Sequence, residues 1–277
     1  MSQEIKKILH TLGTSPQKNL GQNFLINKDK IHKIVAEIER KSYDTIIEVG
    51  PGLGSITKEI LEMQTETICI EKDTILYDYL KEEYKSYENF KIFNKDILRC
   101  ELKNIGQGKR LFFGNLPYNI GTKILDNFVD TFCYEDNSTG IFMFQKEVAE
   151  KILSKKGSKS YNGFVVKVNS FFNITNLVDL TESDFWPQPK VKSVLIKLEN
   201  RNKKFGKIYQ YEEFSEFLFY CFSERRKKLI NNLQRHYSKE LVISALKNLE
   251  LDVNIRAQDI DVDIFSEFFK ILKNNRS

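Results

Sequence analysis

The stretch EVGPGLGSIT, residues 48–57, decides the fold, because a tight glycine turn joins an apolar strand-like run to a helix-like run. Gly50, Gly52 and Gly54 form a GxGxG pattern, whereas a dinucleotide-binding turn reads GxGxxG. Pro51 has no backbone N–H, so the turn offers one donor fewer to a pyrophosphate group. The stretch therefore predicts a strand–turn–helix unit that suits a cofactor without phosphates.

Strand-like and helix-like segments alternate on both sides of this turn, from about Thr45 to Leu198. The predicted strands are rich in Ile, Val and Phe and span 45–50, 67–73, 90–96, 110–116, 139–145, 172–180 and 191–199. Helical spacing recurs between them in 55–64, 74–85 and 120–132. This alternation predicts an α/β fold with a parallel, doubly wound, Rossmann-like sheet, and the last two strands suit an antiparallel edge.

Two carboxylates follow predicted strands at the edge where such sheets bind ligands. Glu71 ends the second strand, and a carboxylate there can accept hydrogen bonds from both ribose hydroxyls of a nucleoside. Asp96 ends the third strand, where it can accept a hydrogen bond from an exocyclic amine such as that of adenine. Together with the glycine turn, these acids indicate S-adenosylmethionine, with a nicotinamide cofactor as the alternative. A tight turn followed by helix caps is the purely structural interpretation.

The segment NLPYN, residues 115–119, ends the fourth predicted strand with an unusual combination of side chains. Pro117 fixes its own φ and holds Leu116 extended, which directs the Asn115 side chain and the Leu116 carbonyl past the strand end. Two such acceptors suit an –NH2 group, and Tyr118 offers a flat face on which a base can stack. A strand-ending turn would explain the asparagine and the proline, but it would not require the tyrosine.

Composition excludes several classes of protein. The chain of 277 residues is 41% hydrophobic and 29% charged, as is typical of a globular protein, and no apolar run approaches the ~20 residues of a membrane span. We expect no signal peptide and a cytoplasmic protein. The four cysteines and three histidines are scattered without metal-ligand spacing, so we expect no metal site. The net charge of +5 permits a nucleic-acid partner but does not require one.

Beyond Glu199 the pattern changes. Residues 201–207 are polar and basic, and only helical spacing follows, beginning with Phe214, Phe217, Leu218 and Cys221. We therefore predict a methyl-donor-binding sheet domain over residues 1–204 and a small helical domain over residues 205–277.

Taken in order, the motifs resemble one family along nearly the whole chain. The chain looks like the small-subunit (16S-type) ribosomal RNA adenine N6,N6-dimethyltransferases, which are related to the Erm-type rRNA methyltransferases. The matching stretches are KNLGQNFLINKDKI (18–31), EVGPGLGSIT (48–57), IEKD (70–73), NKDIL (94–98), GNLPYNI (114–120), QKEVAEKI (145–152), FWPQPKVKS (185–193) and SERRKKLINNL (223–233). The Erm-type enzymes more often carry isoleucine between the Asn and Pro of the fourth-strand motif.

The resemblance assigns expected roles to particular residues. It implies that Gly50 contacts S-adenosylmethionine, Glu71 its ribose and Asp96 its adenine amine, while Asn115 bridges the cofactor and the target amine. Tyr118 would stack on the target adenine and Phe185 would cover the other face of that base; Trp186 is expected to serve packing. The remaining expected cofactor contacts are Gln22, Asn23, Leu25, Gly52, Lys72 and Ile97.

The implied activity is dimethylation of two neighbouring adenosines near the 3′ end of small-subunit rRNA during ribosome biogenesis. We expect a monomer whose helix over 223–233 contacts rRNA phosphates through Arg225, Arg226, Lys227 and Lys228. The alternatives are an Erm-type activity on large-subunit rRNA and a non-catalytic assembly factor on the same fold. A nicotinamide-dependent dehydrogenase is disfavoured by Pro51 and by the absence of a hydride-transfer constellation.

Overall fold

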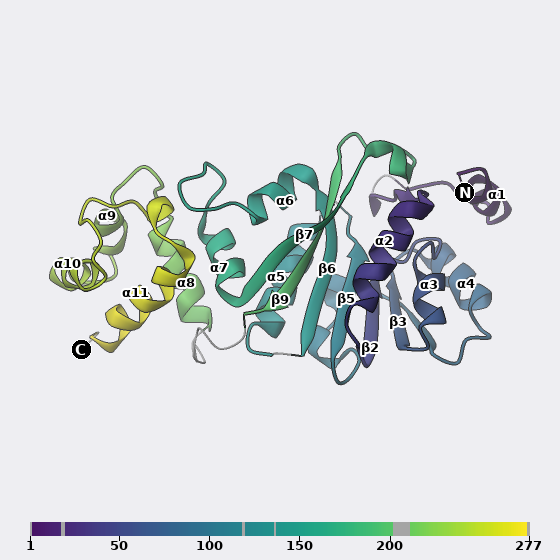
Figure 1. Cartoon of the computed structure of the whole chain (residues 1–277), viewed down its shortest axis with the longest axis horizontal. Coiled ribbons are helices and arrows are strands. Elements are labelled where there is room, and N and C mark those ends of the chain that lie inside the picture. The colour runs from purple at the N-terminus through teal and green to yellow at the C-terminus, as the bar shows by residue number, and fades with distance from the viewer. Residues whose placement is uncertain (1, 18–19, 118–119, 136, 202–210, 276–277) are drawn as a thin grey trace. The chain divides into compact units, whose positions relative to one another are not determined.

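The structure, a computed structural model, describes the chain except for residues 1, 18–19, 118–119, 136, 202–210 and 276–277 (Figure 1). The chain divides into two compact units, each described here by itself. The sheet unit comprises Met1–Ala149 and Ile174–Asn200, and the helical unit comprises Glu150–Asn173 and Arg201–Ser277. Among the described residues, no helix is long and apolar enough to cross a membrane.

A seven-stranded sheet forms the centre of the sheet unit, in the order β4-β3-β2-β5-β6-β9-β7. Its strands are β2 (Thr45–Val49), β3 (Glu66–Glu71), β4 (Phe90–Asn94), β5 (Arg110–Asn115), β6 (Ser138–Gln145), β7 (Phe172–Leu180) and β9 (Ser193–Asn200). The first five pair in parallel, whereas β9 runs antiparallel to β6 and β7 forms the edge. The predicted parallel sheet with an antiparallel margin is confirmed.

Helices cover both faces of this sheet. On one face lie α2 (Lys28–Glu39), α3 (Thr57–Glu62) and α4 (Thr74–Glu83), and α5 (Gly121–Phe132) lies on the other. Ile34 of α2 and Ile60 of α3 pack with Leu111 and Met143 of the sheet. On the opposite face, Phe128 of α5 packs edge-on against the Phe112 ring at 5.6 Å between centroids and against Phe142 at 5.4 Å.

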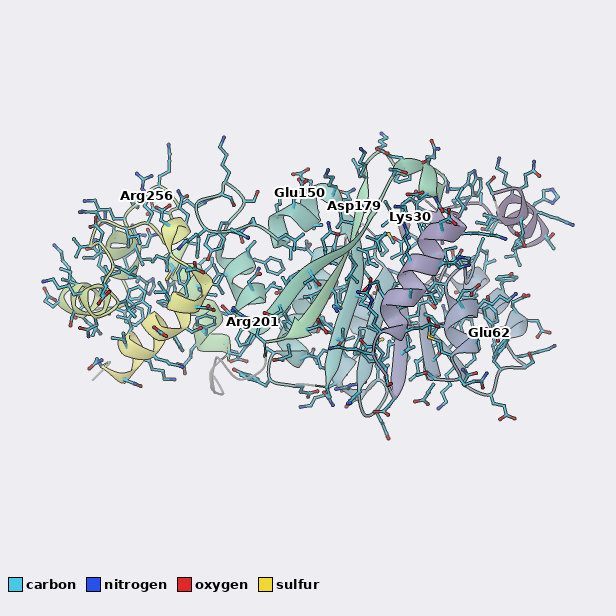
Figure 2. The ribbon with its side chains drawn as sticks, viewed as in Figure 1. Lys30, Glu62, Glu150, Asp179, Arg201 and Arg256 are labelled. Carbon is cyan, nitrogen blue, oxygen red and sulfur yellow. The ribbon has the colours of Figure 1, made fainter. Side chains whose placement is uncertain are left out.

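The N-terminal part of the chain is attached to the sheet by long-range contacts. Strand β1 (Phe24–Leu25) pairs antiparallel with β8 (Phe185–Trp186), and α1 (Ser2–Thr11) packs through Ile5 and Leu9 against a cluster that includes Phe24. The Trp186 side chain also packs against this cluster, as expected. Figure 2 shows Lys30 of α2 beside Asp179 of β7, where Lys30 Nζ donates to the Asp179 carbonyl at 2.5 Å.

The helical unit contains α7 (Gly163–Phe171), α8 (Tyr211–Cys221), α9 (Leu229–Leu233), α10 (Lys239–Asn248) and α11 (Val262–Asn274), while α6 (Lys146–Ile152) spans the division of the chain. The predicted stripe of α8 is buried, and Phe217 packs against Phe268 of α11 at 5.7 Å between ring centroids. The helical unit starts earlier in the chain than predicted, because Phe171 of α7 packs on Phe214 and Tyr211 of α8. The predicted boundary at residue 205 lies outside the described residues.

The helix predicted over residues 223–233 is wrong in its first half. Residues 222–226 form a turn, Lys228 is extended at φ −60° and ψ 143°, and α9 begins only at Leu229. The cause is the buried Asn232 side chain, whose Nδ2 donates to the carbonyls of Cys221 at 2.8 Å and Glu224 at 3.2 Å. A side chain that satisfies these carbonyls stabilises the turn in place of a continuous helix.

Candidate active site

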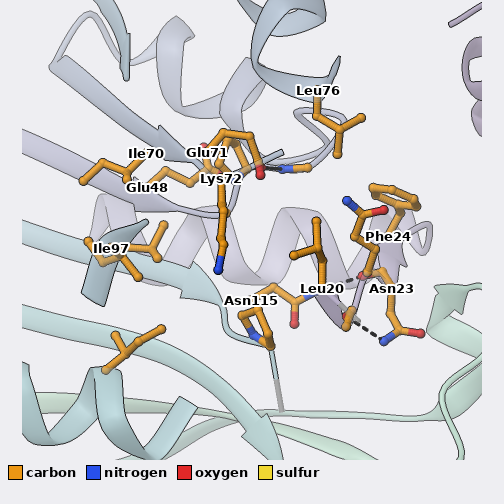
Figure 3. Close-up of a pocket in the computed structure, with 18 of the residues that line it drawn as sticks. Leu20, Asn23, Phe24, Glu48, Ile70, Glu71, Lys72, Leu76, Ile97 and Asn115 are labelled. Carbon is orange, nitrogen blue, oxygen red and sulfur yellow. Dashed lines mark hydrogen bonds between the residues drawn. The ribbon is translucent and has the colours of Figure 1, made fainter. Parts of the chain in front are cut away.

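A pocket lies where the parallel strands β2, β3 and β5 end (Figure 3). The register places Val49 of β2 beside both Ile70 of β3 and Gly114 of β5, so the residues that follow these strands converge. This is the edge at which open α/β sheets bind ligands. Every residue expected to bind the cofactor lines this pocket: Gln22, Asn23, Leu25, Gly50, Gly52, Glu71, Lys72, Asp96, Ile97 and Asn115.

The glycine turn forms one wall of the pocket, and the N–H groups of its three glycines donate hydrogen bonds to other groups of the protein. Gly50 and Gly54 donate to the backbone carbonyls of Ile70 and Pro51, and Gly52 donates to Glu71 Oε2 at 3.2 Å. All three glycines have positive φ, which only glycine adopts readily. A Cβ on Gly50 would meet no atom within 4 Å, so this glycine leaves space beside the pocket.

Glu71 is held at the end of β3 by two backbone amides. Besides the contact from Gly52, the Asp73 N–H donates to Glu71 Oε1 at 2.8 Å. The side chain is only 6% exposed, and burial raises its pKa to about 7 in spite of these hydrogen bonds. Glu71 therefore changes its charge near neutral pH, while each of its oxygens retains a lone pair for a further donor.

Asp96 and Lys72 form an ion pair on the same side of the pocket, with Lys72 Nζ 2.9 Å from Asp96 Oδ2. The other oxygen, Oδ1, accepts from the Leu98 N–H at 3.0 Å and so caps the short helix η2 (Ile97–Arg99). Partial burial acts to raise the pKa of Asp96, but the hydrogen bonds from Lys72 and Leu98 lower it overall. Asp96 is therefore an ionised acceptor at neutral pH.

Asn115 ends β5 with its side-chain amide in a fixed orientation. Its Nδ2 donates to the backbone carbonyl of Asn23 at 3.0 Å, so the amide oxygen is the atom left to accept a hydrogen bond. Beyond it, the Gly121 N–H donates to the Pro117 carbonyl at 2.9 Å, and this turn leads directly into α5. Figure 3 shows Asn115 between the Leu20–Phe24 segment and Lys72.

The segment from Leu20 to Leu25 closes the pocket from the N-terminal side. Gln22 Nε2 donates to Asp73 Oδ2 at 2.7 Å, and the same carboxylate caps α4 through its other oxygen. Phe24 lies against the glycine turn so closely that a Cβ on Gly52 would come within 3.2 Å of its ring. The segment is thus held at both β3 and β5, through Gln22 and Asn23.

Apart from Asn115, the residues expected to contact the target adenine, unlike those expected to bind the cofactor, do not line the pocket in the described part of the chain. The Leu116 side chain is 1% exposed and anchors the turn from the core, which is compatible with a role for its carbonyl. Phe185 is also 1% exposed and belongs to the hydrophobic cluster that contains Leu25, so the structure places it in the core rather than in the pocket. Its contact with a base stays a prediction. Tyr118 lies outside the described residues.

Glu48 is a pocket residue that sequence reasoning missed. It is 3% exposed within β2, where its Oε2 accepts from Thr57 Oγ1 at 2.7 Å and lies 3.7 Å from the Cys69 thiol. A charged residue within an otherwise apolar strand was the available signal. Other lining residues without an expected role include Leu20, Phe24, Ser55, Leu76, Lys95, Phe113 and Ile124. Within the described ranges, no cluster of three or more His, Cys, Asp or Glu side chains could hold a metal ion.

The four basic residues expected to bind RNA lie in the helical unit. Arg225 donates to the carbonyls of Ser158 and Lys159, so it holds the 158–159 turn. Lys227 pairs with Glu224 at 2.8 Å, and Lys228 Nζ donates to an asparagine side chain at 2.6 Å. In the described part of the chain, exposed Arg226 makes neither an ion pair nor a hydrogen bond. Only Lys227 of the four is paired with a carboxylate, and Arg226 is the one whose side chain makes no polar contact with the described residues, so its guanidinium is the most available to a partner.

The sheet order, with a pocket at the carboxyl ends of its parallel strands, is that of a Rossmann-like α/β fold, and a helical part follows it toward the C-terminus. The family model described as "Ribosomal RNA adenine dimethylase" matches residues 13–274. The chain belongs to this family.

Relatives agree with this membership. The chain is 36% identical to the Ribosomal RNA small subunit methyltransferase A of Ureaplasma urealyticum serovar 10, with 99% of this chain and 98% of that protein covered. It is 31% identical to the Natranaerobius thermophilus protein of the same name, over 98% and 96% of the two chains.

Among solved structures, a dimethyladenosine transferase from Plasmodium falciparum matches with a TM-score of 0.76 and 23% identity, over 88% of this chain and 95% of that one. The 23S rRNA methyltransferase ErmE matches with a TM-score of 0.69 and 22% identity, over 91% and 100% of the chains. At these identities the similarity concerns the fold, which both proteins share with this chain.

The buried carboxyl of Glu48 generates a prediction about stability. Burial raises its pKa from 4.5 to about 7, so the folded chain keeps a proton there that the unfolded chain releases at lower pH. We expect this group to lower the free energy of unfolding by about 3 kcal/mol as pH rises from about 4.5 to above 7. Glu48→Gln should flatten this part of the profile.

Urea denaturation of the full chain between pH 4.5 and 8 measures the effect. Glu39→Gln, at an exposed carboxylate on α2, is the matched control and should keep the wild-type profile. A Glu48→Gln profile as steep as that of the wild type would contradict the assignment.

Proposed function

We propose that this chain transfers methyl groups from S-adenosylmethionine to the N6 amines of two adjacent adenosines near the 3′ end of small-subunit rRNA, yielding N6,N6-dimethyladenosine during ribosome biogenesis. Membership in the family and the names of the relatives support the substrate class. The observation that carries the chemistry is the Asn115 amide, which Asn23 holds with its oxygen available as an acceptor.

The donor set of the pocket fits S-adenosylmethionine. Three carboxylates line it, from Glu48, Glu71 and Asp96, and the glycine N–H groups that would hold a phosphate already donate within the chain. Such a pocket favours a cationic, phosphate-free molecule over a nicotinamide dinucleotide. In this proposal Glu71 accepts from the ribose hydroxyls and Asp96 from the adenine amine.

S-adenosylmethionine supplies an electrophilic methyl group on a sulfonium. The chain's task is to position the target amine, whose lone pair is weakly nucleophilic because it is delocalised into the adenine ring. The Asn115 oxygen and the Leu116 carbonyl accept the two N6 hydrogens and so direct the nitrogen lone pair along the line of attack. As the N–C bond forms, the C–S electrons return to sulfur, and the amine releases its surplus proton after transfer. Position and electrostatics suffice, without a strong base.

Asn115→Ala tests the positioning role. We expect kcat for methyl transfer to fall by at least about 100-fold, because a preorganised polar contact to the reacting group is lost. The dissociation constant for S-adenosylmethionine should change little, since Glu71 and Asp96 remain. The assay offers methyl-labelled cofactor to unmethylated small-subunit particles or to large-subunit rRNA and identifies the products by nucleoside mass spectrometry.

In this assay Asn176→Ala, at an exposed asparagine on β7, is the control and should retain activity. Retained turnover by Asn115→Ala would exclude the proposed acceptor role. Label found only in large-subunit RNA would contradict the proposed substrate and favour the Erm-type alternative.

The raised pKa of Glu71 predicts pH-dependent cofactor binding. Ribose hydroxyls donate to the ionised carboxylate, and the ionised fraction of a group with a pKa of about 7 rises from about 10% at pH 6 to about 90% at pH 8. Affinity for S-adenosylmethionine should therefore rise by up to about tenfold over this range. Calorimetric titration of the wild type and Glu71→Gln measures it.

The Glu71→Gln variant should bind the cofactor more weakly and with a flatter pH dependence. Glu39→Gln is the control for general effects of charge removal, and it should follow the wild type. An equal pH dependence in Glu71→Gln and in the wild type would show that another group is responsible.

In the helical unit, Arg226→Glu is the sharpest test of RNA binding. We expect weaker binding to unmethylated small-subunit particles and a salt slope reduced by about one, as for the loss of one phosphate contact. Lys270→Glu makes the same charge change at an exposed position on α11 and is the control. Equal affinities and slopes for Arg226→Glu and the wild type across a salt titration would remove Arg226 from the interface.

A further inference from the structure

A second groove lies on the β3–β4 part of the sheet, on the face opposite α3 and α4. Ile68 and Ile70 of β3 and Phe93 of β4 form its floor. In a doubly wound sheet a helix normally covers each face. Here the connection from β4 to β5 contains only the short helices η2 (Ile97–Arg99) and η3 (Leu102–Asn104), which form a wall of the groove and leave its floor open.

Phe93 is the unusual residue of this groove. It is 45% exposed, although it is an aromatic side chain in a strand. The alternation of β4 places Lys91 and Phe93 on the same face. Lys95, which directly follows the strand, also lines the groove, with its Nζ 5.8 Å from the centre of the Phe93 ring. An open aromatic face between cations is the arrangement that stacks nucleobases in proteins that bind single strands.

The charges of the groove are unequally matched. Lys91 pairs with Glu66 at 2.6 Å, and Glu101 accepts from the Asn104 side chain at 2.7 Å. Lys95 and Arg99 form no ion pair with the residues that the structure describes. The three cations and two carboxylates that line the groove leave a net charge of about +1 to attract an anionic partner. The Asn104 side chain adds a polar group of the kind that contacts base edges.

We infer that this groove binds a single-stranded segment of the RNA substrate, with one base stacked on Phe93 and phosphates near Lys95 and Arg99. The inference rests on the proposed function, because it assumes an RNA substrate. Ile70 and Lys95 line both this groove and the cofactor pocket, so RNA in the groove lies next to the cofactor pocket, on the side of Asp96. The net positive charge of the groove and its open aromatic ring favour RNA over a protein segment, which would more often cover a neutral apolar surface.

Kinetics with unmethylated small-subunit particles and the full chain test the groove. Phe93→Ala should raise KM for the particle by about 5- to 100-fold, the range expected for loss of one stacked base, with kcat and cofactor affinity unchanged. Phe93→Trp should restore the wild-type KM, which a purely structural role would not predict. Arg99→Glu should also raise KM, whereas Lys58→Glu, an exposed cation on α3, should not.

Photo-cross-linking identifies the occupant. With p-benzoylphenylalanine in place of Phe93, the cross-link should form to RNA of the particle. The control carries the same probe at Tyr77 of α4, on the other face of the sheet. Cross-links to a ribosomal protein or to a second copy of this chain, or none above the level of this control, would overturn the inference. If the wild-type chain did not dimethylate the particle, the proposed function would be contradicted. The cross-link at position 93 tests only whether RNA occupies the groove, so the two failures can be told apart.

Discussion

The parallel pairing of β2 with both β3 and β5 is the constraint on which the rest of the sheet unit depends. Because Val49 lies in register with Ile70 and with Gly114, three strands end together. The glycine turn, the Glu71 carboxylate and the Asn115 amide are distant in sequence, yet they meet at one edge. Gly114 permits this closeness, since a Cβ there would come within 2.7 Å of the Val49 carbonyl.

This edge combines close packing with buried charge. Glu48 and Glu71 lie at or near the ends of adjacent strands, and burial raises the pKa of each to about 7. A stable core would avoid two such carboxyls, because desolvating their charged forms costs free energy. Their presence is more easily understood as a property of a site that receives a cation. Ionisation of these two carboxyls near neutral pH lowers the free energy of unfolding, but it provides charged acceptors at the pocket.

The N-terminal segment completes the site by long-range hydrogen bonds. Gln22 is tied to Asp73 after β3, and the Asn23 carbonyl receives the Asn115 amide after β5. The segment therefore contacts both sides of the pocket. One side, near β3, is expected to hold the ribose, and the other, near β5, is expected to hold the target amine. The groove over Phe93 extends the same edge outward, where the helix that would ordinarily cover the sheet is replaced by two short turns.

The sequence by itself determined the strand and helix order, the parallel sheet and the glycine turn, because these depend on local periodicity. The residues expected to bind the cofactor were predicted from strand ends and from the family resemblance, and the structure gathers them around one pocket. Only the tertiary structure decided the rest. It buried Phe185 beside Leu25 through the pairing of β1 with β8, since that pairing joins segments about 160 residues apart by a register that no local pattern specifies. It also replaced the first half of the helix predicted over 223–233 by a turn that buried Asn232 caps, and it recruited α7 to the helical unit through aromatic packing. Local pattern predicts elements and strand ends, whereas the burial of a particular side chain depends on partners that only the folded chain brings together.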